Sequence, residues 1–193
     1  CLSARAQQRW PDALVVHRLD MATSGLVLMA RGAEMQRALS RAFAEQRVEK
    51  HYEAVVDGLL QDTDSGAWHD IDAPIAADWP RRPLRVIDPV QGKPSLTRWR
   101  VKKLLPEASA TSLQLAPRTG RTHQLRVHLA HIGHPILGDA LYGSDDVRSR
   151  APRLLLHATR LSLAHPLTGE QLCFKSESPF EGIVIRSTTD TRS

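Results

Sequence analysis

A charged pair near the start of the chain lies between two apolar runs. Arg18 and Asp20 are separated by a single leucine, and they stand between residues 14–16 and residues 26–30. We interpret both runs as short buried strands joined by a polar loop. A carboxylate in such a loop can act as a nucleophile or a base, because a rigid backbone holds it where a substrate can reach it. The alternative reading of this segment alone is that Asp20 caps a turn and pairs with Arg18.

A second segment, residues 117–128, is dense in hydrogen-bond donors at the predicted start of a helix. Arg118, Arg121 and Arg126, together with the free amides of a first helical turn, could bind an anion. Three cations at this end oppose the helix dipole unless an anion is present, although a solvated helix face remains the alternative. Arg126 flanks the apolar stripe, so we expect it to be partly buried and to need a carboxylate partner, for which Asp20 is a candidate.

Tyr52 follows two basic residues, Lys50 and His51, at the predicted start of a strand. An aromatic ring in this position most often belongs to the core. The chain has only 4 Trp, 2 Tyr and 3 Phe residues, and a tyrosine beside basic residues can also be a platform on which a base stacks.

Three other patterns fail as signs of a known chemistry. His128, His131 and His134 resemble a metal cluster, but His134 lies beyond the predicted helix and no acid stands at the metalloprotease position. Residues 133–138 have the glycine spacing of a phosphate loop without its Lys-Ser/Thr ending. Ser24 lacks the flanking glycines of a nucleophile elbow.

The elements that must position these residues are mostly short strands. We expect strands at residues 14–16, 26–30, 52–56, 95–103, 112–116, 154–157, 161–163 and 171–174, with irregular loops over residues 62–92. Helical spacing predicts one helix over residues 33–46, and a second helix that begins at the N-cap Thr122 and ends at Gly133. Many short strands with two helices predict an α+β fold around a mostly antiparallel sheet.

The strand over residues 95–103 alternates between two kinds of side chain. This period of two predicts a half-buried strand whose open face is basic. One side has Thr97, Trp99 and Val101, and the other has Arg98, Arg100 and Lys102.

Composition narrows the class of protein. The 193 residues include 26 basic and 21 acidic side chains, a net charge of +5, and 41% hydrophobic residues, which is enough for a buried core without disulfides. Only Cys1 and Cys173 are present, which favours a reducing, cytosolic compartment. No apolar stretch is long enough for a bilayer and no signal pattern is visible, so membrane and secreted classes are excluded. The positive charge weakly favours an anionic partner such as nucleic acid.

Together these segments resemble the pseudouridine synthases of the RluA type. The resemblance rests on five ordered motifs: His17-Arg18-Leu19-Asp20 with Thr23-Ser24-Gly25; Lys50-x-Tyr52-x-Ala54-x-Val56-x-Gly58; Gly120 to His128; Gly133-His134-Pro135-Ile136-x-Gly138-Asp139-x-x-Tyr142-Gly143; and Leu154 to Ala158 with His165-Pro166. Residues 21–23, 78–80 and 151–153 resemble the branch that modifies both a tRNA anticodon stem-loop and large-subunit (23S) ribosomal RNA.

The resemblance implies a role for single residues. Asp20 corresponds to the catalytic aspartate of the family, Tyr52 to the tyrosine that stacks on the target base, and Arg126 to the arginine that pairs with the aspartate. Arg18 matches the arginine that enters the RNA stack where the uridine leaves. Leu156 matches an apolar residue beneath the active site.

The implied substrate is structured RNA, and the implied fold is a curved, mainly antiparallel sheet with an RNA cleft across it. We expect contacts to RNA from His17, Arg18, Arg121, His123, Gln124, Arg98, Arg100 and Lys102, and to phosphates also from Arg81, Arg82 and Arg85. The isomerisation changes no oxidation state, so we expect neither a metal nor an organic cofactor. We further expect a cytoplasmic monomer that acts on tRNA and/or 23S rRNA. The alternatives are an RNA-binding module without catalysis and a metal-dependent hydrolase that uses the histidines.

The start of the chain departs from the family pattern. Members usually have a strand with a Lys-Pro-x-Gly-Leu type segment before the motif at His17, and this chain begins at Cys1 without it. We therefore expect residues 1–186 to be one catalytic domain that lacks its N-terminal strand, with a sheet edge left unpaired, and residues 187–193 to be a flexible tail.

Overall fold

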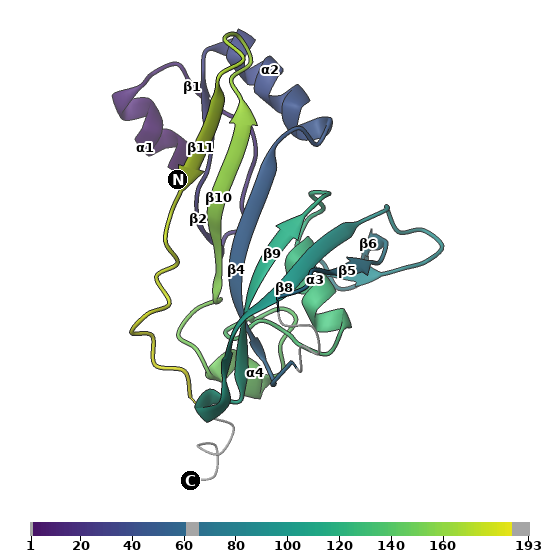
Figure 1. Ribbon diagram of the computed structural model, residues 1–193. Coiled ribbons are helices and arrows are strands. Elements are labelled where there is room, and N and C mark those ends of the chain that lie inside the picture. Colours follow the sequence, from purple (N-terminus) through teal and green to yellow (C-terminus); the bar gives the residue numbers. More distant parts are fainter. Residues whose placement is uncertain (1, 61–65, 187–193) are drawn as a thin grey trace.

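The computed structural model describes residues 2–60 and 66–186. Within these residues the main feature is a twisted, mixed sheet of seven strands, in the order β11–β10–β4–β9–β8–β5, with β2 paired to β10 off this path (Figure 1). Its strands are β2 (Ser24–Gly25), β4 (Glu49–Asp57), β5 (His69–Asp72), β8 (Leu96–Leu105), β9 (Ala110–Pro117), β10 (Leu156–Ala164) and β11 (Gln171–Lys175). All of its pairs are antiparallel except β2 with β10, which is parallel. The predicted α+β fold is confirmed.

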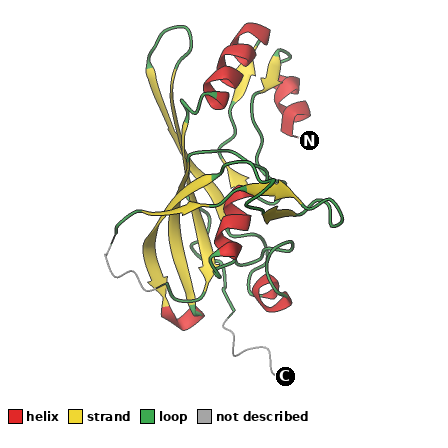
Figure 2. Cartoon of the chain, turned by 90° about the vertical axis from the view of Figure 1, so that its right-hand side faces the viewer, coloured by secondary structure: helices red, strands yellow, loops and turns green. Residues whose placement is uncertain are grey.

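Two small antiparallel pairs and several short helices complete the described chain. The pairs are β1 (Ala13–Val15) with β3 (Met29–Arg31) and β6 (Ile75–Ala77) with β7 (Arg85–Ile87). The helices are α1 (Leu2–Arg9), α2 (Ala33–Ala44), α3 (Gln124–His131) and α4 (Asp145–Ser149), with a 3-10 turn at Pro106–Ala108. Figure 2 shows α1 and α2 at one end of the molecule and α3 and α4 around the other half.

Two apolar clusters hold the fold together. The larger cluster joins the middle of β4 and β9 to α3, with Leu113 and Leu129 fully buried in it. The smaller cluster packs Leu39 of α2 against Leu161 of β10, and Val16 packs against it. The loop of residues 17–23 leaves the smaller cluster at Val16 and reaches the large sheet at β2, so both of its ends are held by packed structure.

Most strongly patterned segments form the elements that their sequences predict. The helix predicted over residues 33–46 is α2, and the alternating strand predicted over residues 95–103 is β8. The two late strands predicted at residues 154–157 and 161–163 form one strand, β10, with a change of register between Ala158 and Arg160 where the pattern breaks.

Other segments differ from the prediction. Residues 62–92 are not wholly irregular, because β5, β6 and β7 lie within them; these strands have only three or four residues each, which is too short for a pattern to be visible. Thr122 is not the N-cap of the second helix: α3 begins at Gln124, and His123 occupies the cap without a side-chain capping bond. The tail predicted to be flexible, residues 187–193, lies outside the described residues. Within the described residues, no helix has the length and apolar character to cross a membrane.

Gly25 allows β2 to lie directly beside β10. Its φ is 109°, and a Cβ at this position would stand 2.4 Å from the carbonyl oxygen of Ala158. The neighbouring Ser24 pairs with His157 in the same parallel ladder, and its Oγ lies 2.7 Å from His157 Nδ1. Glycine is therefore required where the loop of residues 17–23 joins the sheet.

We predict that Gly25→Ala destabilises the fold much more than Gly169→Ala. Gly169 also has a positive φ, 74°, but nothing lies within 4 Å of its added Cβ. Both changes place alanine in a conformation that costs about 1–2 kcal/mol. Only Gly25→Ala adds a clash with backbone, on the order of 1–3 kcal/mol. Urea unfolding measures both, and equal losses of stability would contradict the prediction.

Candidate active site

One hollow gathers residues that are far apart in the sequence. Asp20 of the loop after β1, Tyr52 of β4 and Leu156 of β10 all line it, together with Arg18 and Arg121. The three elements meet because β4 lies directly beside β10 in the sheet, with Ala54 opposite Leu156, and β2 holds the Asp20 loop against β10. The structure thus brings together the acid, the aromatic ring and the apolar residue that the sequence motifs single out.

Two nitrogen-bearing side chains flank the carboxylate of Asp20. Arg126 Nη1 lies 3.8 Å from Oδ2, and His123 Nε2 lies 4.0 Å from Oδ1. The Asp20 side chain keeps 19% of its surface exposed, so it is reachable from the hollow. Its backbone oxygen accepts a hydrogen bond from the Thr23 amide at 2.9 Å, which closes the loop around it.

Arg126 forms the expected ion pair with Asp20 only at the longer distance of 3.8 Å, and its hydrogen-bonded partner is Asp139. Arg126 donates through Nε to Asp139 Oδ2 at 2.8 Å and through Nη2 to Oδ1 at 2.6 Å. Asp139 has no exposed surface, and its Oδ1 also accepts from the backbone amides of Leu141 and Tyr142. Arg126 is therefore locked by a two-pronged bond on one side and presents its remaining charge to Asp20 on the other.

The charge of Arg126 is maintained in spite of burial. Burial disfavours the charged guanidinium, but its hydrogen bonds and proximity to Asp139, with Asp20 and Tyr142 adding to the effect, raise its pKa above the ordinary value. The guanidinium carbon also lies 5.1 Å from the centre of the Tyr142 ring. A fixed positive charge thus stands behind the carboxylate of Asp20.

Tyr52 presents its phenol in the same hollow. In the sheet it lies between Ala158 of β10 and Leu115 of β9. Burial raises the pKa of Tyr52 to about 12, and the nearby charge of Asp20 acts in the same direction. Its hydroxyl therefore keeps its proton at neutral pH.

His17 lines the hollow but is already engaged by the protein. Its Nε2 accepts a hydrogen bond from the Leu28 amide at 2.9 Å, and its ring stacks on Phe43 with centroids 4.4 Å apart. Burial, with a smaller contribution from the charge of Lys50, lowers the pKa of His17 to about 4. The neutral ring fastens the loop that presents Asp20.

The side-chain amide of Gln124 has no hydrogen-bonding capacity left for RNA. Its Oε1 accepts from Thr119 Oγ1 at 2.8 Å and from the Arg121 amide at 2.9 Å, while its Nε2 donates to Leu96 O and Thr97 Oγ1. These bonds fill the capacity of the side chain. Gln124 shapes the turn before α3, and Arg121 beside it is exposed at the rim of the hollow.

The basic face of β8 lies beside a second hollow and is largely paired with other side chains. Arg98 bonds Asp70 at 3.2 Å, Arg100 bonds Gln114 at 2.7 Å, and Lys102 bonds Glu53. Arg98 lines the second hollow together with Trp68. The guanidinium carbons of Arg98 and Arg100 lie over the Trp68 ring, at 5.4 and 4.8 Å from its centre.

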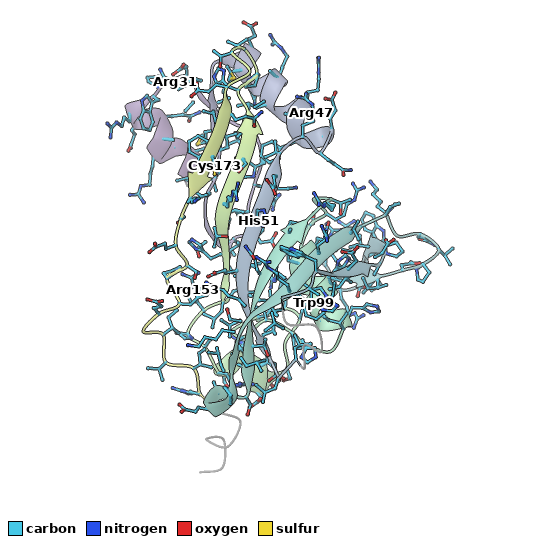
Figure 3. All side chains as sticks on the ribbon, in the orientation of Figure 1. Arg31, Arg47, His51, Trp99, Arg153 and Cys173 are labelled. Atoms are coloured by element: carbon cyan, nitrogen blue, oxygen red, sulfur yellow. The ribbon has the colours of Figure 1, made fainter. Side chains whose placement is uncertain are left out.

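Figure 3 labels Arg47 and His51, two more residues that line the second hollow, on the side where β4 and β8 diverge.

Four residues in or behind these hollows were not predicted as functional. Lys50 and Trp68 line the hollows, whereas Asp139 and Tyr142 lie behind them, bonded to Arg126 and His123. Asp139 and Tyr142 belong to a motif that sequence reasoning quoted without a role, and Lys50 was noted only as a neighbour of Tyr52. Trp68 follows a stretch without visible pattern. The signal available in the sequence for Asp139 was an acid directly after a glycine in that motif. The structure explains the glycine, since a Cβ on Gly138 would lie 1.9 Å from Arg153 O.

The three spaced histidines do not form a cluster. His128 is buried, with Nδ1 at 3.0 Å from Thr97 Oγ1 and Nε2 at 2.9 Å from Ala73 O. His134 Nδ1 lies 2.8 Å from Asp57 O. Throughout residues 2–60 and 66–186, no group of three His, Cys, Asp or Glu side chains is placed to hold a metal ion.

Comparison with known proteins identifies the family. The sequence model of the family described as RNA pseudouridylate synthase matches residues 2–131 of this chain. Since that is more than half of the chain, the protein belongs to the RNA pseudouridylate synthase family.

Relatives cover most of the chain. The dual-specificity RNA pseudouridine synthase RluA of Haemophilus influenzae is 41% identical over 177 residues, which is 92% of this chain and 78% of that protein. The protein of the same name from Escherichia coli is 43% identical over 176 residues, 91% of this chain and 78% of that protein. The solved structure of human RNA Pseudouridylate Synthase Domain Containing 1 matches with a TM-score of 0.80 and 32% identity, covering 96% of this chain and 79% of that one.

We predict that His17 makes the stability of the fold depend on pH. Its pKa is about 4 in the folded protein, against an ordinary value of 6.5, so the unfolded chain binds the extra proton first as the pH falls. The contribution of neutral His17 to the free energy of unfolding is complete above pH 6.5. It decreases as the pH falls from 6.5 to about 4, by up to about 3 kcal/mol in all. The difference between urea unfolding curves of wild type and His17→Gln isolates this contribution, with His131→Gln as control. Parallel pH profiles for all three proteins would refute it.

We predict that Arg126→Met costs about 3–5 kcal/mol of stability and most of the activity. It leaves the carboxylate of Asp139 buried without a cation, and it removes the charge 3.8 Å from Asp20. The double variant Arg126→Met with Asp139→Asn removes the stranded charge and keeps an acceptor for the Leu141 and Tyr142 amides. It should regain part of the stability but not the activity. Recovery of both would show that Arg126 has only a structural role.

Proposed function

We propose that this chain converts uridine to pseudouridine in structured RNA, with Asp20 as the catalytic group. The single observation that supports this most directly is the meeting of Asp20, Tyr52 and Leu156 in one hollow, with Arg126 fixed behind the carboxylate. Membership of the family gives the reaction class, and the geometry suits it: an accessible carboxylate, a protonated phenol and an apolar wall surround a space that a base could enter.

The reaction is an isomerisation, so the composition of the nucleotide does not change. The bond between the ribose C1′ and N1 of uracil breaks, the ring turns, and C1′ joins C5 instead. The proton on C5 leaves and N1 gains one. The carboxylate of Asp20 can either attack C1′ or remove a proton from the sugar, and either role needs an accessible carboxylate held in one orientation. Arg126 supplies that orientation from behind.

The target base must leave its stack to reach this hollow. We assign Tyr52 to the face of the flipped uracil, where stacking is worth about 1–3 kcal/mol. We assign Arg18, exposed on the same loop as Asp20, to the space that the base leaves in the RNA. A planar guanidinium can stack there and offset part of the cost of flipping.

Cations without an anionic partner favour RNA at this hollow. The ammonium of Lys50 and the guanidinium of Arg118 line it, and neither forms a hydrogen bond or ion pair with any described residue. Burial lowers the pKa of Lys50, and a phosphate beside the ammonium would oppose this effect by stabilising the charged form. Arg98 and Lys102, which already bind carboxylates, are weaker candidates for phosphate contacts.

The particular RNA substrates are inferred from the resemblance of the motifs to the branch that modifies two kinds of RNA. Two relatives are called dual-specificity RNA pseudouridine synthases. We infer that this chain acts on a tRNA anticodon stem-loop and/or on 23S rRNA. We also infer that it works in the cytoplasm. The arrangement of residues 1–186 as one domain and the monomeric state remain predictions.

We predict that Asp20→Asn abolishes turnover while RNA binding stays within about threefold of wild type, because the amide keeps the shape and removes the nucleophile or base. The assay follows tritium released from RNA labelled at C5 of uridine, since that hydrogen leaves when C5 joins the sugar. Filter binding gives the affinity for the same anticodon stem-loop.

Asp57→Asn is a suitable control, because it removes a carboxylate far along β4 that binds Arg150 and lines no part of the hollow. Tritium release by Asp20→Asn at the wild-type rate would overturn the assignment. RNA binding by a wild-type chain that releases no tritium from any RNA would favour the alternative, an RNA-binding module without catalysis.

A further inference from the structure

His123 has a backbone conformation that side chains rarely adopt. It lies in the left-handed region, at φ 57° and ψ 17°, where glycine is the usual residue. It holds the N-cap position of α3, yet its side chain makes no capping bond. Instead the ring is turned inward with 11% of the side chain exposed, towards Tyr142 and Asp20. A strained residue aimed at a reactive group indicates a functional constraint.

Tyr142 determines which nitrogen of His123 holds the proton. The Tyr142 oxygen accepts a hydrogen bond from the Arg85 amide at 3.0 Å, and it lies 2.7 Å from His123 Nδ1. Burial raises the pKa of Tyr142 to about 12, so its own proton remains available to donate. Nδ1 is the acceptor within reach, and the hydrogen-bond network therefore assigns the neutral ring a proton on Nε2.

The groups around His123 favour this neutral form. Burial lowers its pKa below the ordinary value; the charges of Asp20 and Asp139 oppose this effect, and those of Arg126 and Arg85 reinforce it. The Nε2–H group is thus a neutral donor, and it faces Asp20 Oδ1 at 4.0 Å while Arg126 faces Oδ2 at 3.8 Å.

We propose that His123 is a positioning residue for Asp20, with its tautomer fixed by Tyr142. The inference rests on the proposed function of Asp20, and it adds His123 to Arg126 as a group that orients the carboxylate. Hydrogen bonds at a reactive centre are often long before substrate is bound. A movement of about 1 Å as RNA enters would bring Nε2–H within bonding distance of Oδ1, and the carboxylate would then be held from both sides.

Protonation of His123 at low pH would break its hydrogen bond with Tyr142. A second proton on His123 goes to Nδ1, which becomes a donor and can no longer accept the Tyr142 hydroxyl. The rate of the chemical step should therefore fall at low pH as the imidazole becomes charged. Tyr142→Phe removes the donor that stabilises the neutral ring, so the pKa of His123 should rise and the loss of rate should begin at a higher pH.

The test compares single-turnover rates, from pH 5 to pH 9, and RNA affinities of wild type, Tyr142→Phe and His123→Gln. We expect both variants to bind the stem-loop within about twofold of wild type. The maximal rate of Tyr142→Phe should fall about tenfold at pH 7, and its acid limb should move to higher pH. For His123→Gln, the part of the acid limb due to His123 should disappear, because the amide does not titrate.

His131→Gln is the matched control, since His131 lies exposed on the same helix. It should leave rate, affinity and pH profile unchanged. Urea unfolding of each variant separates a loss of rate from a loss of fold. If Tyr142→Phe does not fold, the pH profile of His123→Gln still decides the inference.

Two results would overturn the proposal that His123 positions Asp20. An unchanged acid limb in His123→Gln would show that the imidazole does not govern Asp20. Weaker RNA binding by His123→Gln with a wild-type maximal rate would make His123 an RNA contact, as its motif first suggested. A wild-type chain that forms no pseudouridine would instead refute the proposed function, and the two failures are thereby distinguished.

Discussion

The buried bond between Arg126 and Asp139 is the interaction on which the site depends. A carboxylate without exposed surface is very costly unless its oxygens are fully bonded, and Asp139 accepts from Arg126 and from the amides of Leu141 and Tyr142. These bonds fix Arg126 behind Asp20 and fix the turn that offers Tyr142 to His123. The buried charge of Asp139 thereby determines which groups surround the carboxylate of Asp20.

The fold could be predicted where local pattern and tertiary structure agree. α2 has apolar residues at helical spacing, and β8 alternates from Thr97 to Lys102, so the pattern of each indicates one face that packs against other elements. β5, at His69–Asp72, shows no such pattern, because Ile71 is its one residue buried in the core and pairing with β8 holds the rest of the strand. The start of α3 was misplaced because a left-handed residue, His123, precedes it, and propensity does not predict histidine there.

In the candidate site, too, the residues themselves could be predicted from the sequence, but their partners in space could not. Motifs identified Asp20, Tyr52, Leu156 and Arg126 because the residue types and their order are distinctive. Which acid binds Arg126 could not be predicted, because Asp20 and Asp139 both stand in loops and only the path of the chain decides which one comes within bonding distance. Pairing with acids on neighbouring strands, as for Arg98 with Asp70, is invisible for the same reason.

The parallel pairing of β2 with β10 has a consequence for the order of synthesis. Ser24 finds its partner, His157, 133 residues later in the chain. Until the ribosome has released β10, the loop with Asp20 has no sheet to join, and the hollow lacks the wall that Leu156 provides. Contacts of such long sequence separation form late in folding. A nascent chain therefore has its Asp20 motif without an active centre until β10 has emerged and paired, so it cannot modify RNA before that point.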